Sequence, residues 1–109
     1  MPRDEIPPGT LYMMILKTLA RGGQMHGFEI ANAIQRLSQD VLQVEEGSLY
    51  PALQRMLVKG WVTAKWGRTA DNRRARYYRL TAAGRKQLEA ELSQFARVIG
   101  AVQQVIQTA

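Results

Sequence analysis

Cysteine is absent from the sequence, and histidine occurs once, as His26. The lack of thiols excludes disulfide bonds and thiolate zinc sites, and a single histidine argues against a histidine-based metal site. No apolar run is long enough to cross a bilayer, and nothing resembles a signal peptide, so we expect a cytoplasmic protein without a membrane partner. No nucleophile–base set or phosphate-binding loop is evident either. We therefore predict neither an enzyme nor a cofactor.

Acidic residues are scarce in the second half of the chain. Residues 1–60 hold six basic and six acidic side chains, whereas residues 61–109 hold nine basic and three acidic ones and account for the whole net charge of +6. Most of the excess lies in one short segment, where Asp71 is the sole acidic residue among Lys65, Arg68, Arg73, Arg74, Arg76, Arg79, Arg85 and Lys86. Such a cluster is often only a solvated face, but it is also typical of a polyanion contact.

The stretch EGSLYPALQRMLVKGWVTAK, residues 46–65, combines a short helix with the start of a strand. One buried helix face is predicted by four apolar residues at helical spacing, Leu49, Leu53, Met56 and Leu57. Pro51 fits only a first helical turn, so we expect the helix to begin near Gly47 or Ser48 and to end at Gly60. The opposite face is small and polar, which suits insertion into a groove.

Two helices are expected before this one. The first covers Leu11–Ala20 and is apolar on more than one side, which predicts two packing partners. Its expected buried stripe is Leu11, Met14, Ile15, Thr18 and Leu19. The second runs from about Gly27 to Ser38, with an expected buried stripe of Phe28, Ile30, Ala31, Ile34 and Leu37. His26 lies in a predicted turn, Gln24–Gly27, where a structural role at a helix start is favoured. Met1–Pro8 is expected to be a flexible arm.

After Gly60 the apolar period changes from 3.6 to 2, which indicates a β-hairpin. Val62, Ala64 and Trp66 share one face of its first strand. Alternation resumes at Tyr77–Leu80, after a polar, arginine-rich loop. Trp61 and Trp66 could stack on bases, but we expect tryptophans beside a small strand at the core or its edge.

The last predicted helix starts after Thr81, a good N-cap. Its apolar residues follow a heptad pattern over nearly three heptads: Leu88, Leu92, Phe95, Ile99, Val102 and Ile106. A helix of about 25 residues would be roughly 38 Å long, which exceeds what so small a domain covers. Packing on its own core is the simpler interpretation, and we favour a dimerisation helix that pairs with a second subunit.

Three helices, a hairpin and a long terminal helix predict a winged helix-turn-helix, a mainly α fold with a small β-hairpin. The helix near Ser48 would be the recognition helix and the hairpin the wing, whose arginines would lie beside the groove that the helix enters. We expect residues 1–80 to form the DNA-binding domain, including the arm at 1–8. Residues 81–109 would form the dimerisation helix.

Four motifs in this order resemble PadR-type transcriptional regulators: HGFEI at 26–30, EGSLYPAL at 46–53, KGWVTAKW at 59–66 and RYYRLTAAGRKQL at 76–88. The resemblance covers about residues 9–92 and is closest to the branch with a single C-terminal helix. It implies a homodimeric repressor of a palindromic operator on double-stranded DNA, often released by a small-molecule effector. Some members of that branch hold flat aromatic ligands against a tryptophan of the last helix. The last helix of this chain has no tryptophan, and Phe95 is the nearest candidate for that role.

Within the resemblance, Ser48, Tyr50 and Pro51 match the recognition-helix motif, and three residues match the basic wing, Arg73, Arg74 and Arg76. From their positions alone, the candidates for base edges are Ser48, Gln54 and Arg55. The candidates for phosphates are Lys65, Arg68, Arg73 and Arg74, and Lys59 lies at the edge of the same helix face. Tyr50 could either pack or reach a phosphate.

A possible effector pocket would involve Met13, Met14 and Phe95, although a plain interface core is the simpler interpretation of these residues. The sequence leaves two alternatives open. One is a DNA-binding protein that responds to no effector. The other is a winged-helix protein–protein adaptor, for which binding to duplex DNA would be weak and abolished by salt.

Overall fold

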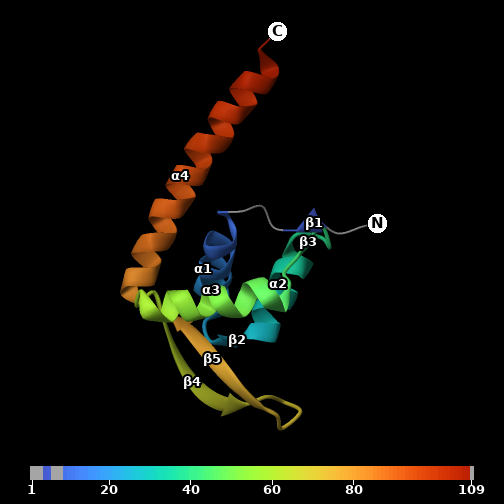
Figure 1. Cartoon of the computed structure of the whole chain (residues 1–109), viewed down its shortest axis with the longest axis vertical. Helices are drawn as coiled ribbons and strands as arrows, with labels where there is room; N and C mark the ends of the chain where they lie inside the picture. The colour runs from blue at the N-terminus through green and yellow to red at the C-terminus, as the bar shows by residue number, and fades with distance from the viewer. Residues whose placement is uncertain (1–3, 6–8, 109) are drawn as a thin grey trace.

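The computed structural model describes residues 4–5 and 9–108 (Figure 1). Its elements follow one another as β1 (Asp4–Glu5), α1 (Leu11–Gly22), β2 (Met25–His26), α2 (Gly27–Leu37), β3 (Leu42–Gln43), α3 (Glu46–Val58), β4 (Val62–Arg68), β5 (Arg74–Leu80) and α4 (Ala82–Gln107). This order confirms the predicted fold class, a mainly α winged helix-turn-helix with a long C-terminal helix. None of the described helices is both long and apolar enough to cross a membrane.

The core lies where α1, α2 and α3 meet the base of the hairpin. Its largest fully buried side chains are Ile15, Leu16, Leu19, Ile30, Leu49, Leu53 and Met56. The predicted stripe of α2 was wrong at both ends, because Phe28 is 65% exposed and Leu37 is 48% exposed. Ile30, Ala33 and Ile34 form the buried face instead, at spacings of three and one. Leu37 lies on this face but at the last position of the helix, and Phe28 lies about 160° around the helix from Ile30.

The stripe predicted for α1 was also partly wrong. Leu11 and Met14 are only half-buried, whereas Met13 and Leu16 join the core. A helix that is apolar on several sides gives no unique buried stripe, so its neighbours decide which residues lie inside. Thr18 is buried as predicted, and its hydroxyl donates to the Met14 carbonyl at 2.7 Å. That bond satisfies the one polar side chain buried on this helix.

The hairpin belongs to a three-stranded sheet in the order β2-β5-β4. β4 and β5 pair antiparallel from Val62↔Leu80 to Arg68↔Arg74. β2 pairs with the other edge of β5, with Met25 opposite Tyr78. The predicted turn at Gln24–Gly27 therefore contains a short strand. The sequence pattern missed it because two residues are too few to show a period of two.

A second, parallel pairing joins β1 to β3, with Asp4 opposite Leu42. Asp4 and Glu5 thus belong to a strand, although Met1–Pro8 was predicted to be a flexible arm. The rest of that arm, residues 1–3 and 6–8, lies outside the described residues.

α4 is 26 residues long and leaves the three-helix core soon after it begins (Figure 1). Thr81 caps it as predicted, because its hydroxyl accepts from the Gly84 amide at 3.0 Å. The same hydroxyl donates to the Gly60 carbonyl at 2.7 Å and so anchors the helix start to the end of α3. Of its residues, only Gly84 and Leu88 are buried. At 1.5 Å per residue the helix is about 39 Å long, so most of its length has no partner within the chain.

Candidate nucleic-acid interface

α3 packs against the core through Leu49, Ala52, Leu53 and Met56. Since successive residues turn by about 100°, the stripe that faces directly away from the core consists of Gly47, Pro51, Gln54 and Val58, all of them exposed. Ser48 is exposed as well. The centre of the exposed face is therefore narrow and uncharged, and the predicted face also included Arg55, with Lys59 at its edge.

Pro51 does not lie in the first turn of α3, which corrects the expected helix start. The helix begins at Glu46, and the Glu45 carbonyl accepts from the amides of Ser48 and Leu49 at 3.0 and 2.9 Å. Pro51 is thus the sixth helical residue and cannot donate to the Gly47 carbonyl. Gly47 is exposed, so that carbonyl can be satisfied by solvent.

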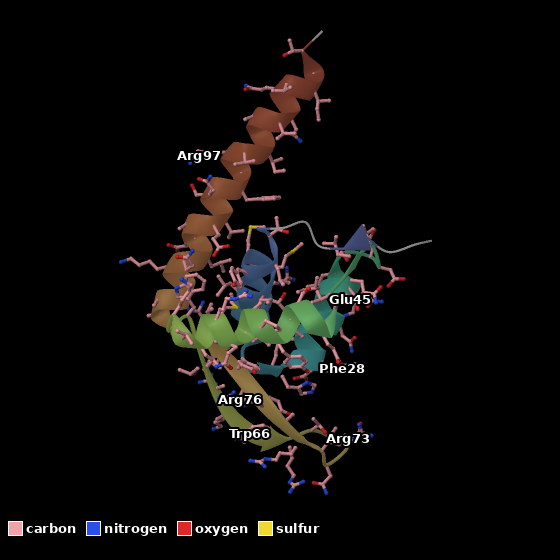
Figure 2. All side chains as sticks on the ribbon, viewed as in Figure 1. Phe28, Glu45, Trp66, Arg73, Arg76 and Arg97 are labelled. Carbon is pink, nitrogen blue, oxygen red and sulfur yellow. The ribbon has the colours of Figure 1, made fainter. Side chains whose placement is uncertain are left out.

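A cleft of about 730 Å³ separates the start of α2 and α3 from the wing, residues 62–80. We call it the interface cleft. Its walls combine aromatic and cationic side chains, chiefly His26, Phe28, Tyr50, Trp66, Arg73, Arg74, Arg76 and Tyr78. Figure 2 shows the labelled Trp66, Arg73 and Arg76 on the wing and Phe28 on α2. The structure thus brings the predicted recognition helix and the predicted basic wing to one surface.

Tyr50 lines the cleft and is 47% exposed. Its ring covers the first residue of α2, because a Cβ atom added at Gly27 would lie 2.9 Å from a ring carbon of Tyr50. Tyr78 lies on the other side of the same cleft. Burial raises the pKa of Tyr78 above its ordinary value of 10.0, and the nearby positive charge of Arg76 opposes the shift. Tyr50 therefore packs along one edge and stays open to solvent along the other.

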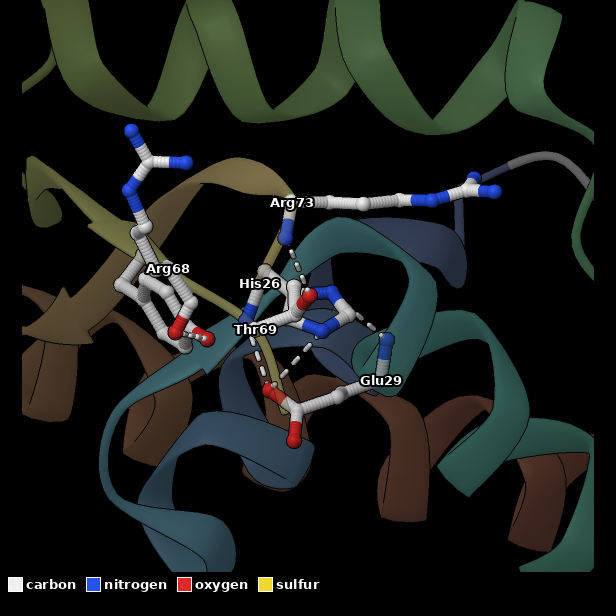
Figure 3. A network of polar contacts seen from close by, with 6 residues as sticks. His26, Glu29, Arg68, Thr69 and Arg73 are labelled. Atoms are coloured by element: carbon white, nitrogen blue, oxygen red, sulfur yellow. Dashed lines mark hydrogen bonds and ion pairs between the residues drawn. The ribbon is translucent and has the colours of Figure 1, made fainter. Parts of the chain in front are cut away.

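His26 caps α2, as predicted from its position. Its Nδ1 accepts from the Glu29 amide at 3.4 Å, and the Glu29 carboxylate accepts from the His26 amide at 3.0 Å (Figure 3). This reciprocal pair is a capping box. The imidazole also contacts Tyr77 edge-on, with ring centroids 5.3 Å apart. His26 thereby ties the start of α2 to the wing.

The wing tip is held by hydrogen bonds rather than by apolar packing. The Thr69 amide donates to the Arg73 carbonyl at 2.8 Å, and the Arg73 amide donates to the Thr69 hydroxyl at 3.1 Å. Asn72 adopts a left-handed conformation with φ 61°. Arg68 donates to the Asn72 carbonyl at 3.1 Å. Figure 3 shows the Arg73 side chain extending away from this network, so its guanidinium is available to a ligand.

The two tryptophans have different surroundings. Trp61 packs against the core edge and meets Tyr12 edge-on at 6.1 Å, which confirms the prediction for that residue. For Trp66 the prediction was wrong, because this residue is 57% exposed and lies on the wall of the interface cleft. Its position toward the outer end of β4 carries it beyond the three helices. Its partner across the strands, Arg76, is the sequence signal that could have indicated this.

Two basic residues of α3 lie on the flank away from Tyr50. The Arg55 guanidinium donates to the Tyr12 hydroxyl at 2.8 Å, and the Lys59 ammonium lies 5.3 Å from the Trp61 ring. Both side chains are exposed, and a guanidinium has further N–H donors beyond the one used here. Lys65 is exposed on β4, on the face opposite to Trp66.

The predicted dimerisation residues form an apolar stripe on α4. Leu88 is buried against the core, whereas Leu92, Phe95, Ile99, Val102 and Ile106 are exposed in the single chain. Of the candidate effector residues, Met13 belongs to the core. Met14 lines a separate cavity of about 300 Å³ with Ile34 and Leu37, and neither Met13 nor Phe95 lines it.

Comparisons with known proteins agree with this geometry. The model of the transcriptional regulator PadR-like family matches residues 15–90. An uncharacterized protein of Lysinibacillus sphaericus is 30% identical over 98 residues, which are 90% of this chain and 89% of that protein.

Solved structures give the same fold. A PadR-like transcriptional regulator from Bacillus cereus is 25% identical, with a TM-score of 0.77 over 93% of this chain and 95% of that chain. A transcriptional regulator from Clostridium thermocellum is 23% identical, with a TM-score of 0.82 over 91% and 95%. Bacillus subtilis PadR in complex with operator DNA is 23% identical, with a TM-score of 0.68 over 80% of this chain and 48% of that one.

Proposed function

The chain belongs to the PadR-like family of transcriptional regulators, and we propose that it is a homodimeric repressor of a palindromic DNA operator, released by a small-molecule effector. As a member of this family it is a regulator of transcription rather than an enzyme. The observation that carries the proposal is the interface cleft, which is lined by Tyr50 of α3 together with Arg73, Arg74 and Arg76 of the wing. That Bacillus subtilis PadR has been solved with operator DNA supports the choice of ligand.

In the proposed complex α3 enters the major groove and reads bases, while the wing lies along the flanking backbone. Gln54 is central on the exposed stripe, and glutamine pairs well with the adenine edge. Ser48 and Arg55 lie together on one side of the stripe, with Arg55 held by Tyr12. Pro51 supplies an apolar surface, and Lys59 lies at the end of the helix. Tyr50 would reach the backbone from the cleft wall.

The wing supplies the phosphate contacts in this proposal. The cationic residues proposed for these contacts are Lys65, Arg68, Arg73, Arg74 and Arg76, all on β4, β5 or the loop between them. Contacts of this kind position the protein without reading sequence. They also make the affinity fall by roughly 0.9 log unit per contact for each log unit of salt.

Residues 81–109 form the proposed dimerisation part of the chain, and residues 1–80 the DNA-binding part. Two copies would pair through the exposed stripe of α4 and present two α3 helices to successive major grooves about 34 Å apart. A change in the angle between the two α4 helices would alter this spacing, which gives an effector a route to release DNA. Met14 and Phe95 are the accessible candidates for such a site, and Met13 would support it from the core.

The first test is fluorescence anisotropy with duplexes that tile the region upstream of the chain's own gene, near physiological salt. A shuffled duplex serves as the control. We expect one tile to bind far more tightly than the shuffled duplex, with two chains per site. Equal and weak binding to all tiles, abolished by salt, would instead favour a protein–protein adaptor.

A further inference from the structure

Trp66 has surroundings that core packing does not explain. More than half of its surface is exposed, on the wall of the interface cleft. The strand register places Trp66 directly opposite Arg76, and Arg74 lies two residues away on the same face of β5. The Cζ atoms of Arg74 and Arg76 lie 4.3 and 5.8 Å from the indole centroid. Both distances are within the range of a cation–π contact.

The same face of the hairpin concentrates positive charge. Arg68 lies directly opposite Arg74 in the register, and like charges in that position repel each other. Within the part of the chain that the structure describes, neither Arg74 nor Arg76 forms an ion pair with a carboxylate. The indole lies against both guanidiniums, and Arg76 has a second polar partner in the Tyr78 hydroxyl.

A stacked guanidinium differs from a salt-bridged one in what it leaves free. Stacking on an indole uses the flat face of the guanidinium, and its N–H donors all lie in the plane, along the edges. A carboxylate partner would occupy those edges. Arg74 and Arg76 are thus ordered before any ligand arrives, with their N–H groups still able to bind an anion. Ordering them in advance lowers the entropy lost on binding.

We infer that Trp66 is a positioning residue for DNA binding, which acts by holding Arg74 and Arg76 on the cleft side of the wing with their N–H edges toward a phosphate. This inference rests on the proposed function. It assigns no direct DNA contact to the indole itself. The effect of changing Trp66 must therefore depend on whether the two arginines are present.

The test is a double-mutant cycle with the full-length chain and its operator duplex. Trp66→Leu should weaken binding about two- to fivefold, the range expected of exposed cation–π contacts. Trp66→Phe should lose less, because phenylalanine keeps an aromatic face. In a chain that already carries Arg74→Gln and Arg76→Gln, Trp66→Leu should cause no further loss. If it causes the same loss there, the indole contacts DNA directly and the inference is overturned.

Arg79 provides a matched control, because it lies on the opposite face of β5. The effects of Arg79→Gln and Trp66→Leu should multiply without coupling. Equal coupling of Trp66 to Arg79 and to Arg74 would indicate a general loss of wing structure and overturn the inference. Circular dichroism and thermal unfolding check that each variant folds.

A readout without DNA separates this inference from the proposed function. In a Trp61→Phe chain, Trp66 is the only tryptophan, so its fluorescence reports on its own surroundings. Removing both guanidiniums should expose the indole and raise its quenching by acrylamide. Unchanged quenching would show that no stack exists. If the wild-type chain binds no duplex at all, the proposed function fails and the DNA role fails with it, while quenching still decides whether the stack forms.

Discussion

At the scale of single residues, Tyr78 links the core to the interface. It is buried on the core side of the wing, and burial raises the pKa of its hydroxyl above 10.0. The folded chain therefore holds this proton more tightly than the unfolded chain does. The contribution to stability is complete at lower pH and is lost as the pH rises from about 10 through the raised pKa.

Tyr78→Phe tests this relation. The variant keeps the ring but has no proton to lose, so the free energy of unfolding should fall less steeply above pH 10 than in the wild type. Denaturant unfolding at about pH 8 and about pH 11 measures it. Other tyrosines and lysines titrate in both proteins, so the difference between the two slopes isolates Tyr78. Identical slopes would contradict the assignment.

Gly84 is a second residue whose role is local. It lies in the first turn of α4, and a Cβ atom there would overlap the Trp61 carbonyl oxygen and come within 2.7 Å of a Leu80 methyl carbon. Gly84→Ala should therefore reduce the free energy of unfolding by about 1–3 kcal/mol, the usual effect of overpacking. Gly47→Ala is the control, because nothing lies within 4 Å of that position. It should leave stability unchanged or raise it by up to about 1 kcal/mol.

At the scale of elements, α3 and the wing are assigned different tasks, and binding data can separate them. Arg73→Ala should weaken binding to the operator and to a shuffled duplex by the same factor, and should lower the salt slope by about 1. The reason is that a phosphate contact carries no sequence information. Arg97→Ala removes an equal charge from α4, at a position far along the helix from the wing (Figure 2). This control should leave both the duplex affinity and the salt slope unchanged.

Gln54→Ala should act in the opposite way. It should relax discrimination between operator and shuffled duplex by about 1–3 kcal/mol and leave the salt slope as it is. Competition anisotropy at two salt concentrations measures both properties. A changed salt slope with intact discrimination would place Gln54 on the backbone and contradict its assignment to a base edge.

The elements also show how far the sequence could predict the structure. Long periodic patterns were sufficient for α1 to α4 and for the β4–β5 hairpin, because each has enough residues to show its period. The two-residue strands β2 and β3 have no such signal and depend on tertiary pairing. Phe28 and Trp66 were placed in or near the core on hydrophobicity alone. Trp66 is exposed because the three-helix core ends before the outer part of β4, which no local pattern contains. Phe28 is exposed because it lies about 160° around α2 from Ile30, and the helical period alone could have indicated this.

At the scale of the whole molecule, the main unexplained surface is that of α4. The chain measures 57 × 35 × 22 Å, and the long axis reflects this helix (Figure 1). Its apolar stripe repeats at spacings of three and four, and Ile106 is 74% exposed. Soluble monomers rarely leave a long apolar stripe in water, so a second helix is the expected cover. The proposed homodimer would provide it and would set the distance between the two α3 helices.

Ile99→Asp tests this arrangement, because it places a charge in the middle of the stripe. An unpaired carboxylate buried between two helices is strongly unfavourable, so the variant should be monomeric in analytical ultracentrifugation at concentrations where the wild type is dimeric. Gln104→Asp introduces the same charge on the opposite side of α4, about 140° around the helix, and should remain dimeric. A monomer has one α3 per particle, so Ile99→Asp should also lose operator affinity while keeping weak binding to any duplex. If Ile99→Asp stays dimeric and binds the operator like the wild type, the interface lies elsewhere, and the spacing of the two α3 helices must be set by another surface.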